Sequence, residues 1–167
     1  NLRKQRFLAV VLRKSPRLPA PIPDNEPERI AALRRMLLLS SPDEEAFDRV
    51  TRAAKRIFSV PIALVSLIDP HRQWFKSCIG LPVRETAREV SFCGHAIVFG
   101  HLFVIEDATS DPRFSDNPLV TGDPRVIFYA GRPLYNSEGY AVGTLCIIDH
   151  HPRTFSVDDH RSLDDLG

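Results

Sequence analysis

Regularly spaced cysteines are missing from this sequence of 167 residues, which contains only Cys78, Cys93 and Cys146. An odd number of cysteines without paired spacing argues against a disulfide framework and favours a reducing compartment. Long apolar runs are missing too, since none approaches the roughly 18 residues that a membrane-spanning helix requires. We therefore expect a cytoplasmic protein without a membrane partner.

An excess of charge of one sign is also absent. The chain has 22 lysines and arginines against 21 aspartates and glutamates, a net charge of +1 at pH 7. Because that balance is not typical of nucleic-acid-binding proteins, we expect no nucleic acid among its partners. The 43% of hydrophobic residues is ordinary for a globular protein, and the length fits one domain with a substantial core.

Basic residues and prolines gather in residues 1–24. Six lysines and arginines stand there against one acidic residue, Asp24, and four prolines follow Ser15. Prolines at this density prevent a helix and favour extended chain, so we interpret 1–24 as a linker or upstream extension. An amphipathic arm that binds a membrane surface or a partner is the alternative. The chain lacks an initial Met and ends within a predicted helix, so we expect it to be a piece of a longer protein.

Apolar spacing predicts an α+β domain over residues 25–167. Helical spacing with Asn25 and Ser41 as caps predicts two helices, one over 25–39 and one that begins at Ser41. A short helix is expected at 92–98 and a last one after Ser156. Apolar runs separated by turns predict strands at 62–68, 73–78, 102–106, 126–134 and 140–148. This order indicates an antiparallel sheet with helices packed against it.

The second predicted strand alternates between two faces. One face carries Arg72, Trp74 and Lys76, and the other carries Gln73, Phe75 and Ser77. If Phe75 packs inward, the face with the charged residues is directed to solvent or a partner.

The stretch Ser91–Ile97 places a thiol, a glycine and an imidazole side by side, at Cys93, Gly94 and His95. A structural zinc site needs four ligands, and no CxxC or HxxxH pair supplies the others, so we predict no metal site. Taken without the rest of the sequence, Cys93 and His95 could also form a nucleophilic Cys/His pair. Cys146 lies in an apolar run and is most simply a core residue.

Nine short blocks of sequence stand in the order and with the gaps of one known family. They are Ile62–Asp69, Arg72–Ser77, Glu85–Thr86, Ser91–Ile97, Asp107–Ala108, Asp111–Phe114, Asn117–Pro118, Phe128–Leu134 and Gly143–Asp149. On these blocks the chain from about Pro27 to Gly167 resembles a GAF domain of the bacterial signalling type. The resemblance implies a PAS-like antiparallel sheet of about five to six strands, with helices behind it and a loop-roofed pocket in front.

The resemblance further implies a non-enzymatic sensor, which binds a small molecule, acts as a homodimer and regulates an attached kinase or nucleotide-cyclase domain. The sequence identifies neither the ligand nor a cofactor. We expect the first and last helices to form the dimer and to carry the output, with the helix at 92–98 as the roof of the pocket. The candidate ligand-binding residues are Phe92, Cys93, His95, Asp107, Arg113, Phe128, Tyr129 and Arg132.

For two of these candidates, Arg113 and Tyr129, the chemistry of the side chain suggests a role in ligand binding, and Arg113 also has an alternative structural role. Arg113 offers a bidentate grip on a carboxylate or phosphate, or else it pairs with Asp107 or Asp111 and fixes its own loop. The hydroxyl of a buried Tyr129 needs a hydrogen-bond partner, which a ligand would supply.

Two functions from other classes stay open. Free-methionine sulfoxide reductases are GAF proteins with a Cys-Gly near position 93, but they need a further redox cysteine before the strand that matches Phe128. Residues 122–125 contain no cysteine, which leaves the chemistry of Cys93 without its partner. We therefore expect Cys93 to be reduced and non-catalytic. The second alternative is a ligand-free scaffold that serves only dimerisation.

Overall fold

The computed structural model describes residues 2, 4, 5 and 18–167, and most of the predicted basic segment lies outside them. A six-stranded antiparallel sheet forms the middle layer, in the order β3-β2-β1-β6-β5-β4. Its strands are β1 (Ile62–Ile68), β2 (Arg72–Ile79), β3 (Glu85–Ala87), β4 (Phe103–Ile105), β5 (Phe128–Tyr135) and β6 (Ala141–Asp149). The predicted α+β, GAF-like fold is confirmed.

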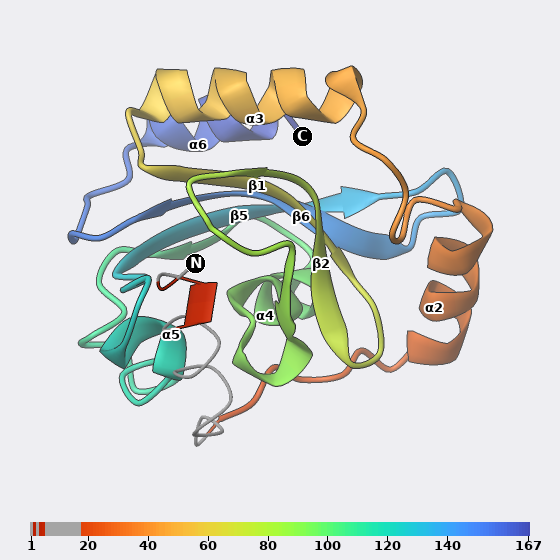
Figure 1. Cartoon of the computed structure of the whole chain (residues 1–167), viewed down its shortest axis with the longest axis horizontal. Helices are drawn as coiled ribbons and strands as arrows, with labels where there is room; N and C mark the ends of the chain where they lie inside the picture. The colour runs from red at the N-terminus through yellow and green to blue at the C-terminus, as the bar shows by residue number, and fades with distance from the viewer. Residues whose placement is uncertain (1, 3, 6–17) are drawn as a thin grey trace.

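Helices cover both faces of this sheet (Figure 1). On one face lie α3 (Glu45–Phe58) and α6 (Val157–Asp164), and on the other lie α4 (Phe92–Phe99) and the short α5 (Pro118–Thr121). Helix α2 (Glu26–Arg35) packs at the end of the sheet, and one turn of 3-10 helix (Arg88–Val90) precedes α4. No helix in the described part of the chain is long and apolar enough to span a membrane.

Apolar cores form on both faces of the sheet, because strands present alternate side chains to opposite faces. Behind the sheet, Ala54 and Phe58 of α3 pack against Val65, Phe128 and Leu145. In front of it, a larger core is built from the inner side chains of the sheet, α4 and the segment 103–127. The candidate site lies within this second core.

The first two helices differ from the prediction at the segment that joins them. Helix α2 ends at Arg35 instead of Leu39, and α3 begins at Glu45 instead of after Ser41. The ammonium group of Lys76 explains the late start of α3, because it donates hydrogen bonds to Ser41 Oγ at 2.6 Å and to the carbonyl of Pro42 at 2.7 Å. These contacts hold the intervening chain outside the helix, so the predicted Ser41 cap was wrong.

A bulge in β2 also changes the predicted faces of that strand. Val65 lies opposite Ser77 but Ser66 lies opposite Phe75, so Lys76 is an additional residue in the strand. Lys76 is fully buried beneath the segment that precedes α3, and Trp74 is buried with the apolar residues beside α2. The expectation that these side chains face solvent or a partner was therefore wrong.

Candidate ligand-binding site

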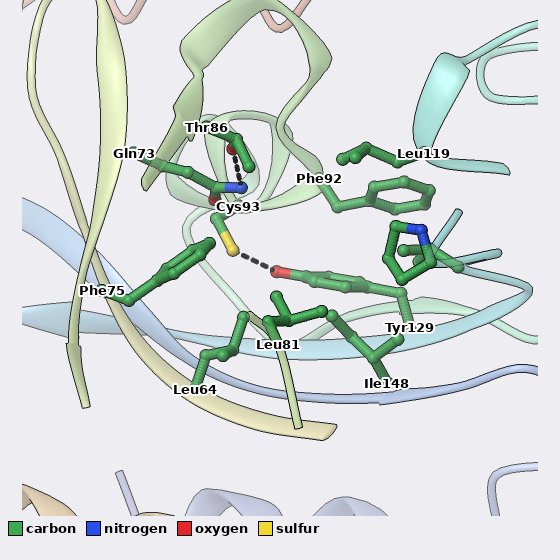
Figure 2. Close-up of a pocket in the computed structure, with 12 residues that line it drawn as sticks. Leu64, Gln73, Phe75, Leu81, Thr86, Phe92, Cys93, Leu119, Tyr129 and Ile148 are labelled. Atoms are coloured by element: carbon green, nitrogen blue, oxygen red, sulfur yellow. Dashed lines mark hydrogen bonds between the residues drawn. The ribbon is translucent and has the colours of Figure 1, made fainter. Parts of the chain in front are cut away.

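A small cavity lies between the front of the sheet and α4 (Figure 2). The residues that line it are Leu64, Gln73, Phe75, Leu81, Thr86, Phe92, Cys93, Leu119, Pro124, Val126, Tyr129 and Ile148. Its volume is about 20 Å³, which is room for about one water molecule. The side chains around the cavity thus fill almost all of the space between α4 and the sheet.

Local sequence determines how α4 roofs this cavity. The Ser91 hydroxyl caps the helix by accepting a hydrogen bond from the amide of Gly94 at 2.7 Å, and Gly100 ends it in a left-handed conformation. Between them all residues except His95 are apolar or glycine, and those from Phe92 to Ile97 are buried, as expected where protein surrounds a helix.

The outer side of α4 is covered by the segment 18–22. Ala20 is buried and donates its amide to the carbonyl of Glu89 at 3.1 Å. A Cβ atom at Gly94 would lie 2.6 Å from the Cβ of Ala20, so only glycine allows this close approach. The C-terminal end of the proline-rich segment is therefore part of the roof.

The polar atoms of the cavity wall bind one another. Gln73 Nε2 donates to Thr86 Oγ1 at 2.7 Å, and Ser66 Oγ donates to Gln73 Oε1 at 3.3 Å. The Tyr129 hydroxyl donates to Cys93 Sγ at 3.3 Å, as Figure 2 shows. No lining residue carries a charge at neutral pH other than a cysteine that loses its proton.

Cys93 of α4 and Cys146 of β6 bring their sulfur atoms within 3.7 Å of each other, and both cysteines are free and buried. Burial acts to raise the pKa of Cys93, but hydrogen bonds, led by that from Cys146, outweigh it and lower the pKa to about 7. The pKa of Cys146 is raised, because its proton bonds to Cys93 and because it is buried. These surroundings favour the thiolate at Cys93 over Cys146.

Among the predicted ligand contacts, Phe92, Cys93 and Tyr129 line the cavity (Figure 2). His95 does not line it. The His95 ring is buried against Phe114, with 4.7 Å between ring centroids. Burial, followed by the charge of Arg113, lowers the pKa of His95 to about 4, so the imidazole is neutral at pH 7.

The two charged candidates of the segment 107–113, Asp107 and Arg113, bind to other residues of the same segment. Arg113 donates to both oxygens of Asp111, at 2.9 and 2.6 Å. Half-buried Asp107 accepts from the amide and hydroxyl of Thr109 at 2.9 and 2.6 Å. Arg113 thus adopts the loop-fixing arrangement that the sequence left open as its alternative, with Asp111 as the partner.

Phe128 and Arg132 lie on the opposite face of the sheet from Tyr129. Phe128 packs into the core behind the sheet, and Arg132 Nε donates to the carbonyl of Asp164 in α6 at 3.1 Å. Because neighbouring residues of a strand alternate between faces, these side chains cannot share one cavity with Tyr129. Sequence reasoning also missed Gln73 and Thr86, although the alternation of the strand, which places Gln73 on the same face as Phe75, was an available signal for Gln73.

The antiparallel sheet and the cavity beneath a short roofing helix define a class of fold, and comparison with known proteins agrees. The model of the GAF domain family matches residues 43–166. The chain therefore belongs to the GAF domain family, as the sequence predicted.

One full-length relative gives the most specific comparison. Over 133 residues the chain is 47% identical to a protein of Pseudomonas aeruginosa named cyclic di-GMP phosphodiesterase. The aligned region covers 80% of this chain and 23% of that protein. The chain thus spans less than a quarter of the relative's length. Because the relative is named as an enzyme, it contradicts our prediction that the protein is not an enzyme.

Solved structures show the same fold at lower identity. The GAF domain of an Acinetobacter phosphoenolpyruvate-protein phosphotransferase is 19% identical with a TM-score of 0.60, covering 83% of this chain and 87% of that one. Free methionine-R-sulfoxide reductase of Neisseria meningitidis is 16% identical with a TM-score of 0.59, covering 84% and 80%. At such identities the likeness concerns the fold alone, and it does not favour the reductase alternative.

Proposed function

We propose that this GAF domain binds a small uncharged ligand between α4 and the sheet and thereby regulates hydrolysis of cyclic di-GMP by the protein to which it belongs. The name of the P. aeruginosa relative supports the output reaction. We propose in addition that the domain acts as a homodimer. The observation that carries the ligand proposal is a cavity lining without lysine, arginine, histidine, aspartate or glutamate.

The lining disfavours charged ligands, because an ion would lose its hydration in the cavity without gaining a charged partner. An ion moved from water into a site without a charged partner costs several kcal/mol or more, even after relaxation of the protein. Arg113, the candidate for anion binding, is paired with Asp111 and does not line the cavity. Cyclic di-GMP, with two phosphates, is therefore proposed as the substrate of the output domain and not as the ligand of this cavity.

Binding would have to move the roof, because the cavity holds only about 20 Å³. A molecule larger than one water must displace α4 or α5 from the sheet. Any displacement of α4 acts on Ala20, which packs against Gly94. We propose that the ligand favours the displaced arrangement of the roof and shifts the population toward it, and that the N-terminal segment carries the change onward.

The proposal is tested by thermal unfolding of the chain with matched probes. Indole and benzyl alcohol are the neutral probes, and benzoate and indole-3-acetate are their anionic counterparts. At 100 times Kd a ligand stabilises by about 2.7 kcal/mol, which for a domain of this size raises Tm by roughly 5–11 °C. We expect a saturable rise with neutral probes alone.

Val126→Phe places a larger side chain in the cavity and should abolish the rise. Val157→Phe makes the same change at an exposed position of α6 and should leave the rise intact. Equal responses to neutral and anionic probes, or no response to any neutral probe, would contradict the proposed ligand class.

A further inference from the structure

The two buried cysteines in front of the sheet form a pair that the proposed ligand site does not require. Their sulfur atoms are 3.7 Å apart, and the residues are 53 positions apart in sequence, on α4 and β6. A disulfide bond is about 2.05 Å long, so bond formation needs an approach of about 1.7 Å. Since Cys93 also lines the cavity, a molecule that enters the cavity meets this sulfur.

We propose that Cys93 and Cys146 form an oxidisable dithiol, which a small hydroperoxide converts into a disulfide that ties the roof helix α4 to strand β6. The proposal goes beyond ligand sensing and does not depend on it. The reactant is defined by its chemistry, a peroxide small enough to reach a nearly filled cavity.

The reaction proceeds in two balanced steps. The thiolate of Cys93 attacks one peroxide oxygen, the O–O bond breaks, and the leaving oxygen takes up a proton, so that Cys93 becomes a sulfenic acid. Cys146 then attacks the Cys93 sulfur, the S–O bond breaks, and the hydroxide leaves as water with the proton of Cys146. Two thiols and one hydrogen peroxide give one disulfide and two water molecules, whereas an organic hydroperoxide gives one water and one alcohol; in both cases two electrons pass to the peroxide.

The surroundings of Cys93 suit the first step. The thiolate is the reactive form of cysteine, and the Tyr129 hydroxyl donates a hydrogen bond to Cys93 Sγ at 3.3 Å. Although burial opposes ionisation, hydrogen bonds led by that of Cys146 lower the pKa of Cys93 to about 7. Burial raises the pKa of Cys78, the third cysteine, which makes Cys78 a suitable internal control.

The test uses the 167-residue chain and hydrogen peroxide. After the peroxide is quenched with catalase, the protein is denatured, its free thiols are alkylated, and its intact mass and cross-linked peptides are measured. We expect the number of alkylated cysteines to fall from three to one, with a peptide link between Cys93 and Cys146 that dithiothreitol reverses. Cys78→Ser should retain the link, whereas Cys93→Ser and Cys146→Ser should lose it.

Tyr129→Phe provides a second test that does not remove either sulfur. Loss of the hydrogen bond to the thiolate should slow disulfide formation roughly three- to tenfold at pH 7 and leave the final link unchanged. The proposal is overturned if all three cysteines of the wild-type protein remain alkylatable, if the link involves Cys78, or if Cys93 goes to the sulfinic acid while Cys146 stays free. An unchanged rate in Tyr129→Phe would overturn the assigned role of Tyr129.

Discussion

A buried ion-pair triad connects α2 to the 3-10 turn that precedes α4, and Glu26→Gln tests its contribution to stability. The Glu26 carboxylate accepts hydrogen bonds from Arg29, at 2.7 and 3.0 Å, and from Arg88, which directly precedes the roof helix. The side chains of Arg29 and Arg88 are 1% and 5% exposed, and that of Glu26 is 16% exposed. The substitution keeps the shape of the side chain and removes its charge.

The expected loss follows from the two guanidinium groups left behind. Removal of one partner of a buried ion pair costs about 3–5 kcal/mol. Two contacts that remain reduce this cost, since Arg29 also donates to the Ala141 carbonyl at 3.4 Å and Arg88 to that of Asp69 at 3.3 Å. With the partial exposure of Glu26 we expect a loss of about 2–4 kcal/mol in the free energy of unfolding, or roughly 4–16 °C in Tm.

Urea unfolding followed by circular dichroism at pH 7 measures this loss, and Glu45→Gln is the matched control. Glu45 also lies in the first turn of a helix and pairs with an arginine, Arg52, but both side chains are about half exposed or more. Exposed ion pairs contribute little, so the control should lose far less stability. Equal losses in the two variants would refute the assignment of a special role to the triad.

The difference in stability between wild type and Glu26→Gln should depend on pH. Burial acts to raise the pKa of Glu26, but hydrogen bonds from Arg29 and Arg88 outweigh it and lower the pKa. The carboxylate therefore stabilises the fold fully above its unfolded pKa of about 4.3 and loses this effect as the pH falls through the lower folded value. The gap between wild type and Glu26→Gln should be widest at pH 7 and close below about pH 4.

Two further variants test the roof helix. His95 has a folded pKa of about 4, lowered by burial and then by Arg113, against about 6.5 when unfolded. Because the unfolded chain binds the proton first, stability should fall by about 2–3 kcal/mol as the pH drops from 6.5 to 4. Urea unfolding across this range should show a flatter curve for His95→Gln, and identical curves would contradict the reading. Gly94→Ala would place its Cβ 2.6 Å from that of Ala20, so hydrogen exchange at the Ala20 amide should accelerate, whereas Ser137→Ala in the exposed turn between β5 and β6 should leave that exchange unchanged.

The features that sequence predicted well are those that depend on local pattern. Strand β1 has the predicted bounds, because an apolar run between Pro61 and Asp69 is buried along its whole length. Helix α6 begins at the predicted Ser156 cap, where Ser156 and Asp159 form a reciprocal capping box. In both cases the residues that decide the structure are close together in sequence.

The features that sequence missed depend on contacts between distant segments. The bulge at Lys76 is set by pairing with β1 and by the segment 41–44, so alternation within β2 could not reveal it. Two of the three candidate contacts on β5, Phe128 and Arg132, do not line the cavity for a related reason. A run of three apolar or aromatic residues does not show which face its members take, and register with β6 decides that Tyr129 faces the cavity while Phe128 faces α3.

The Cys-Gly-His sequence of the roof is explained by helix geometry, since successive residues point about 100° apart around α4. Cys93 meets Cys146 of the sheet, Gly94 admits Ala20, and His95 packs on Phe114. The three residues therefore join α4 to three different elements. Because they lie within one helical turn, a displacement at one of these contacts also moves the other two. A ligand or a disulfide beneath Cys93 would act first on the segment at Ala20, because the whole sheet separates α4 from α3 and α6.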